Sequence, residues 1–132
     1  MRQPRYGDIF AGHDEGESMA EMARVLWAEY KADLEGRGIW NNARGRTLDR
    51  LVRTSVEYYQ ISPIAIAEGP VDEAANGNRY MSYHWSAMHK LSDQISKLEK
   101  ALALTPESVG EKQAAPKAPP AKSKADEFLA AH

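Results

Sequence analysis

The sequence contains no cysteine among its 132 residues, which excludes disulfide bonds, thiolate zinc sites and cysteine nucleophiles. No apolar run approaches the roughly 20 residues that a membrane-spanning helix requires. The beginning of the sequence also lacks the apolar core of a signal peptide. These absences predict a soluble intracellular protein with no membrane partner.

Positive charge is not in excess either, because the formal net charge is -2 at pH 7. This balance argues against binding nucleic acid through the charge of the whole chain, although a local basic patch repeated in an oligomer remains open. There is no glycine-rich phosphate loop, no Gly-x-Ser-x-Gly elbow and no His-Glu-x-x-His metal motif. We therefore expect a binding and assembly protein that is not an enzyme and has no cofactor and no metal.

What the sequence does contain is helical periodicity, which predicts one mainly α-helical domain. The tail is rich in proline, alanine and lysine without an apolar period, so we expect it to be disordered. The predicted layout is a flexible N-terminal arm at residues 1–16, a helical DNA-binding core at 17–68, a short β-hairpin and long oligomerisation helix at 69–106, and the tail at 107–132.

The helical core is expected to be a helix-turn-helix-like pair. A capping-box pattern beginning at Ser18 and an apolar face predict a first helix over residues 18–35, which glycines end. A second helix is predicted from about 47 to 67, with Pro63 expected to kink or interrupt it. The turn between the helices carries Trp40, which we expect to pin it to the core.

Stretch 81–102 is the longest regular pattern, with apolar residues that alternate between steps of three and four. This is the spacing of a helix that packs one narrow stripe against other helices. Asn76-Gly77, just before it, is a strong hairpin signal. The candidate oligomerisation residues on this helix are Trp85, Met88, Leu91, Ile95, Leu98 and Leu102. An ordinary helix packed inside one small domain explains the periodicity equally well.

Positive charge is concentrated on and before the second predicted helix. Arg46, Arg50 and Arg53 follow i, i+4 and i+7 spacing on one helix face, with Arg44 just ahead and Arg37 in the turn. Arginines on the second of two helices are compatible with a helix-turn-helix that contacts the phosphates of double-stranded DNA. A solvated arginine face is the plainer explanation of the same pattern.

In the predicted tail, Phe128 and Leu129 stand alone among small and charged residues. A disordered linker tipped by a few apolar residues is typical of a docking peptide that becomes ordered only on its partner. A frayed tail with two incidental apolar residues is the alternative.

The order of these features resembles the phage terminase small-subunit family over roughly residues 20–110. The resemblance rests on a tryptophan-bearing helix that ends in leucine, a glycine with an apolar pair, a Leu-Asp that opens the next helix, the hairpin and a closing Leu-Ala-Leu-Thr-Pro-Glu-Ser. The positions in the first half are Trp27, Leu34, Gly38, Ile39, Trp40, Leu48 and Asp49. Ala103 stands where the family has glycine, which we expect to let the helix run a turn further, and Val109 replaces a usual arginine.

The resemblance implies a ring-forming, non-enzymatic protein that recognises viral DNA in the host cytoplasm. It would deliver the genome to the terminase large subunit and regulate that subunit's ATPase and nuclease. A homo-oligomeric ring, a nonamer being one candidate, would repeat a modest basic patch into a continuous track. Phe128 and Leu129 would dock on the large subunit. A dimeric helix-turn-helix transcription regulator and an oligomeric adaptor that does not bind DNA stay open as alternatives.

Overall fold

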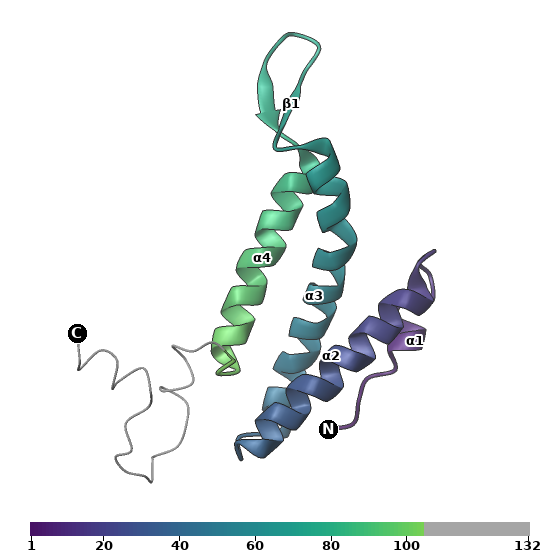
Figure 1. Cartoon of the computed structure of the whole chain (residues 1–132), viewed down its shortest axis with the longest axis vertical. Coiled ribbons are helices and arrows are strands. Elements are labelled where there is room, and N and C mark those ends of the chain that lie inside the picture. The colour runs from purple at the N-terminus through teal and green to yellow at the C-terminus, as the bar shows by residue number, and fades with distance from the viewer. Residues whose placement is uncertain (105–132) are drawn as a thin grey trace, which may run out of the picture.

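The computed structural model describes residues 1–104, and this part confirms a mainly helical fold with a short β-hairpin (Figure 1). Its elements are α1 (Tyr6–Ile9), α2 (Gly16–Gly36), α3 (Asn42–Glu68), β1 (Val71–Glu73), β2 (Arg79–Met81) and α4 (Tyr83–Ala101). The tail, with the predicted docking residues Phe128 and Leu129, lies outside the described residues. α3 and α4 run side by side, the hairpin joins them at one end, and α2 crosses α3 toward the other.

The helix α2 follows the predicted apolar face but starts earlier than predicted. Its first residue is Gly16, and Glu15 at the N-cap makes no side-chain capping bond, so the predicted capping box at Ser18 is wrong. Glycine is required at this start, because a Cβ on Gly16 would lie 2.2 Å from the carbonyl oxygen of Phe10. The face that α2 buries consists of Met19, Ala20, Ala23, Trp27 and Leu34.

The helix α3 begins at Asn42, within the predicted turn. Asn41 caps it, since its side chain accepts a hydrogen bond from the Arg44 backbone N–H at 2.8 Å, and this is a favoured N-cap arrangement. Pro63 lies inside the helix, which continues to Glu68 without the predicted interruption. A proline removes one backbone donor, and packing of α3 against α4 sustains the helix across that loss.

The hairpin forms at the predicted Asn76-Gly77 turn, where Gly77 has a φ of 87°. β1 and β2 are antiparallel in the register Val71 to Met81, and every residue of both strands is exposed. Its base is fixed by Ser82, which is buried and whose hydroxyl donates to the Gly69 carbonyl at 2.8 Å. The hairpin is therefore anchored at its base alone.

The N-terminal segment is the main correction to the sequence-based layout, which predicted a flexible arm at residues 1–16. Tyr6 and Phe10 are only 1% and 5% exposed, and both belong to the hydrophobic core. The Tyr6 hydroxyl donates to Asp49 on α3 at 2.9 Å, and its ring meets the edge of Trp27. The segment is anchored by only two buried aromatic side chains. Two residues are too few to produce a helical period, so the sequence pattern did not predict this docking.

The end of α4 also differs from prediction. The helix stops at Ala101 instead of running a turn further, and Ala103 adopts a left-handed conformation with a φ of 59°. This is the backbone geometry that glycine usually supplies after a helix. Ala103 and Leu102 are both 1% exposed, so burial in the core holds the alanine in a conformation it rarely adopts.

Candidate nucleic-acid interface and assembly surface

The predicted arginine face exists on α3, on the side away from the core. Arg46 and Arg50 are exposed, and within residues 1–104 their side chains make no hydrogen bond or ion pair. Lys97 of α4 extends this surface, because it and Arg50 line one open depression of about 350 Å³ between the two helices. Sequence reasoning missed Lys97, which lies 47 positions along the chain from Arg50. We call Arg46, Arg50, Arg53 and Lys97 the basic face.

Arg53 belongs to the basic face but shares its charge with a neighbour. Its Nη2 lies 2.9 Å from Oδ2 of Asp49, and its Nε donates to Oδ1 of the same carboxylate at 3.1 Å. A guanidinium has five N–H donors, so this pair leaves donors over for a phosphate. Asp49 also accepts from Tyr6. Burial, followed by the Asp49 charge and this hydrogen bond, raises the pKa of the Tyr6 hydroxyl above its ordinary value.

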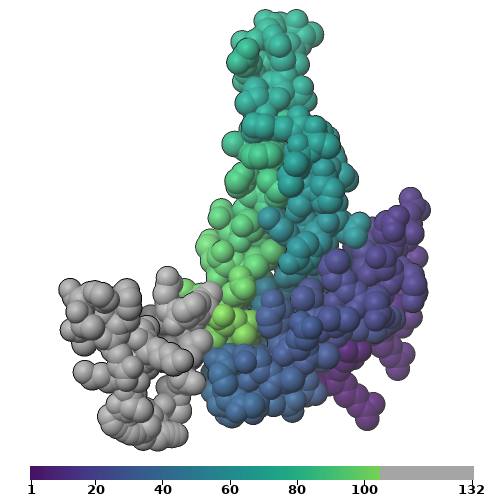
Figure 2. Space-filling model, in the orientation of Figure 1, coloured from purple at the N-terminus to yellow at the C-terminus, as the bar shows by residue number. Residues whose placement is uncertain are grey.

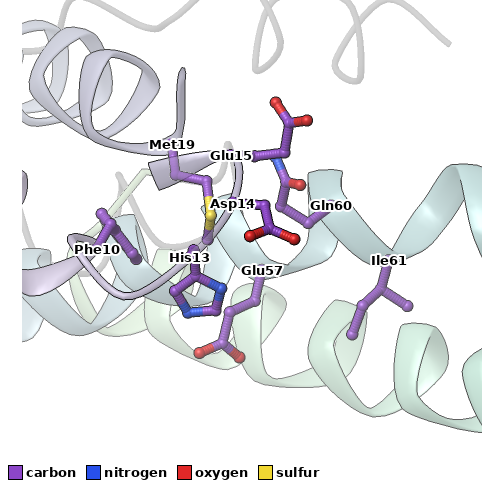
Figure 3. A pocket seen from close by; sticks show the side chains of 8 residues that line it. All are labelled: Phe10, His13, Asp14, Glu15, Met19, Glu57, Gln60 and Ile61. Carbon is purple, nitrogen blue, oxygen red and sulfur yellow. The ribbon is translucent and has the colours of Figure 1, made fainter. Parts of the chain in front are cut away.

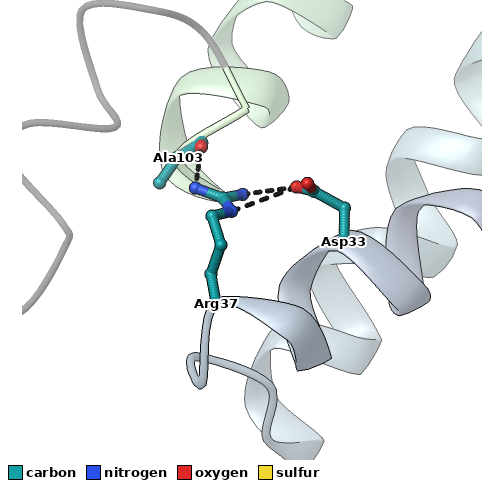
Figure 4. Close-up of polar contacts among 3 residues, drawn as sticks. All are labelled: Asp33, Arg37 and Ala103. Carbon is teal, nitrogen blue, oxygen red and sulfur yellow. Dashed lines mark hydrogen bonds and ion pairs between the residues drawn. The ribbon is translucent and has the colours of Figure 1, made fainter. Parts of the chain in front are cut away.

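The other two candidate arginines are engaged in tertiary contacts. Arg37 donates two hydrogen bonds to Oδ2 of Asp33, from Nη2 at 2.7 Å and from Nε at 3.1 Å. Its Nη1 donates to the Ala103 carbonyl at 2.8 Å (Figure 4). Arg44 donates from Nη1 to the Ile39 carbonyl at 2.7 Å. Arg37 thus ties the end of α2 to the end of α4, and Arg44 closes the turn. We leave both out of the basic face.

The candidate oligomerisation stripe on α4 packs largely against its own chain. Leu102 is 1% and Met88 8% exposed, while Ile95 and Leu98 pack against the buried core. The remaining two candidates on α4, Trp85 and Leu91, are half-buried. Packing within one domain, which was the alternative explanation of the periodicity, therefore accounts for much of this stripe.

A larger exposed apolar surface lies at the hairpin end of the molecule, where sequence reasoning did not place one. This surface belongs to the hairpin end, which projects beyond the body in the space-filling view (Figure 2). We call it the apolar tip, and its members are Ile64, Ile66, Val71, Tyr80, Met81 and Tyr83, with Tyr83 78% and Ile66 67% exposed. Large apolar side chains that are exposed together at one end of a molecule are typical of interaction surfaces. The three members in the hairpin gave no sequence signal because its strands are too short to show an alternating pattern, and the other three belong to α3 and α4.

Two chemical classes of site do not appear in the described part of the chain. Among residues 1–104, no group of three or more histidine, aspartate or glutamate side chains is placed to hold a metal ion. Over the same residues, no helix has the length and apolar character to cross a membrane. The features that remain are the basic face, the apolar tip and a cleft near the N-terminal segment.

A family model described as phage terminase, small subunit, matches residues 23–118. The match covers well over half of the chain and runs from α2 through α4, so it includes both the basic face and the apolar tip. The docked aromatic residues Tyr6 and Phe10 precede it. No curated protein and no solved structure matches the chain.

Proposed function

We propose, for a chain that belongs to the phage terminase small-subunit family, that it binds double-stranded viral DNA through its basic face and brings that DNA to the terminase large subunit. Family membership supports a role in phage genome packaging in general. The finer proposal includes regulation of the large subunit's ATPase and nuclease, with no enzymatic activity in this chain, and a site of action in the host cytoplasm.

One observation carries the DNA-binding proposal, namely two exposed arginines that have no protein partner within residues 1–104 and that lie beside a lysine from a second helix. A phosphate that approaches Arg46, Arg50 or Lys97 displaces only water and counterions, since these side chains have no ion pair to break within the described residues. Contacts of this kind position a protein on DNA without reading its sequence. The net charge of -2 is no obstacle, because the potential that DNA meets is the local one.

Assembly into a homo-oligomeric ring is supported by the apolar tip. Ile66 and Tyr83 expose most of their surface in the single chain, and burial of that surface between copies is favourable. Identical chains bury identical surfaces most readily by closed symmetry, and a ring repeats the basic face around its circumference. A nonamer is one such ring.

The test is a double charge reversal, Arg46→Glu with Arg50→Glu, measured for DNA affinity by fluorescence anisotropy over a series of salt concentrations. Each phosphate contact contributes about 0.9 to the slope of log affinity against log salt, so we expect the slope to weaken by about 2 per bound copy. Affinity should fall at least ~10-fold. The matched control is Arg5→Glu with Lys90→Glu, which makes the same charge change at two exposed residues that do not belong to the basic face.

The outcomes separate the competing functions. The proposal is wrong if the Arg46 and Arg50 variant keeps its oligomeric mass by light scattering and binds DNA with the wild-type slope. A wild-type protein that is a clean dimer and binds one operator would instead favour the transcription regulator. A wild-type oligomer that shows no DNA binding at low salt would favour the adaptor.

A further inference from the structure

A cleft of about 430 Å³ opens between the loop after α1, the start of α2 and the middle of α3 (Figure 3). Its floor is apolar and its rim is acidic. Phe10, Met19 and Ile61 form the floor, and Asp14, Glu15 and Glu57 form the rim, with His13 and Gln60 between them. We call this the acidic cleft. Its volume lies within the range of ordinary ligand-binding sites.

The chemistry of the acidic cleft selects its ligand. Three carboxylates around an apolar floor repel phosphates, so DNA is excluded, and they attract a chain that alternates cationic and small apolar groups. The rings of Phe10 and His13 lie edge-on with their centroids 6.3 Å apart and give the cleft an aromatic lining, the kind of surface on which proline-rich segments pack. An extended proline-rich segment binds with little loss of conformational freedom, because proline has already restricted it.

The chain itself contains a segment of this chemistry, at residues 112–124. The segment reads KQAAPKAPPAKSK, with four lysines, three prolines and no acidic residue. We propose that residues 112–124 dock in the acidic cleft of their own chain, with lysines against the carboxylates and proline and alanine against the floor. This contact involves neither DNA nor the large subunit, so it stands independently of the proposed function.

The reach of the chain permits this docking. The described part ends at Leu104, next to the end of α2, because Arg37 holds the Ala103 carbonyl there. The acidic cleft lies at the opposite end of α2, whose 21 residues span about 31 Å at 1.5 Å per residue. About 14 residues join Leu104 to the middle of the segment, and a chain of that length spans up to about 46 Å when fully extended. The segment therefore meets the cleft at a high effective concentration.

The absence of native cysteine allows the contact to be trapped in the full-length protein. Gln60→Cys places a thiol in the acidic cleft and Ala121→Cys places one in the segment. The control pairs Ala121→Cys with Ala43→Cys, an exposed position at the start of α3 nearer to Leu104. Random encounters of a tethered chain would oxidise the Ala43 pair at least as fast. Docking predicts that the Gln60 pair closes at least ~10-fold faster under mild oxidation, followed by non-reducing gels and intact mass.

Charge reversal identifies the interaction behind the trapping. Asp14→Lys with Glu57→Lys should abolish the faster closure, whereas the same change at Glu29 and Glu35, exposed residues of α2 outside the cleft, should leave it intact. Adding Lys122→Glu and Lys124→Glu to the reversed cleft should restore it. Circular dichroism checks that each variant is folded.

Three results would overturn the proposal. The first is equal closure rates for the Gln60 and Ala43 pairs. The second is closure that charge reversal of the cleft leaves unchanged. The third comes from mixing the Gln60→Cys and Ala121→Cys single variants, where a disulfide that joins two chains as efficiently as the double variant closes one would assign the segment to a neighbouring copy.

Discussion

The two ends of the α3–α4 pair differ in how much of their apolar surface is covered by the rest of the chain. At the end near α2, Trp27, Leu48 and Leu102 are at most 2% exposed and pack with the N-terminal aromatics in one core. At the hairpin end, Ile66 and Tyr83 are more than half exposed. Both ends are rich in apolar side chains. Only the first has α1 and α2 to cover them.

This difference assigns separate tasks to the two ends. The covered end folds from the contacts of one chain and presents the basic face on its outer side. We expect the apolar tip to be buried against another copy of the chain, since a two-stranded hairpin on its own is at best marginally stable in water. The stability of the single chain should therefore depend on the first end, and the mass of the assembly on the second.

The largest effect is expected from Trp27→Ala at the covered end. Truncating a fully buried aromatic side chain leaves a cavity and should lower the free energy of unfolding by about 3–5 kcal/mol. Val25→Ala, on the exposed side of the same helix and 46% exposed, should cost less than ~0.5 kcal/mol. Urea denaturation at fixed protein concentration measures both. A small effect at Trp27 would remove the argument that this end holds the fold.

The next effect is expected at the apolar tip, from Ile66→Ser combined with Tyr83→Ser. These side chains are exposed in the single chain, so circular dichroism should show unchanged helix content. Loss of about 1.4–2.8 kcal/mol per interface would raise the protein concentration needed for assembly roughly 10- to 100-fold. Light scattering over a dilution series reads this directly. An unchanged mass profile would show that copies do not meet at the tip.

A smaller effect is expected from Arg37→Ala, which removes the tie between α2 and the end of α4. A charged hydrogen bond to the Ala103 carbonyl and a partly exposed ion pair with Asp33 should together contribute about 1–2 kcal/mol. Arg37→Lys keeps the charge without the fork and should recover only part of this. DNA affinity should stay within ~3-fold of wild type in both variants. A loss of DNA affinity in Arg37→Ala with no loss of stability would instead add Arg37 to the basic face.

How far the sequence predicts this molecule follows from where each contact lies along the chain. Periodic faces predicted α2, α3 and α4, and the Asn76-Gly77 pair predicted the hairpin, because each of these signals is local. The partners of Arg37 were hidden, since Ala103 lies 66 positions away. Two anchoring aromatics leave no period, so the docked N-terminal segment was missed. The joining of Lys97 to Arg50 depends on how α4 packs on α3, which no local pattern contains.

The smallest effect is expected from Tyr6→Phe, which removes one hydroxyl and no packing. Asp49 keeps its ion pair with Arg53, so no buried acceptor is left without a hydrogen-bond partner. The free energy of unfolding near neutral pH should therefore fall by about 1 kcal/mol. The pH dependence makes the test sharper. Because burial and Asp49 raise the pKa of Tyr6 in the folded chain, its hydroxyl keeps its proton above pH ~10 while the unfolded chain releases it. The stability from Tyr6 is thus fully present below pH ~10 and is lost as pH rises further.

Wild-type stability should therefore fall above pH ~10 more steeply than that of Tyr6→Phe, with up to about 1.4 kcal/mol per pH unit of extra slope from this one group. Tyr30, whose pKa burial and then Glu99 also raise, contributes the same slope to both proteins and cancels in the comparison. Urea denaturation at several pH values between 8 and 11 should show the free energies of unfolding of the two proteins converging. The difference shrinks because the wild type alone loses the stability that protonated Tyr6 contributes. Parallel curves across this range would mean that Tyr6 is not held protonated against Asp49, and that the N-terminal segment is less tightly joined to the covered end than its burial indicates.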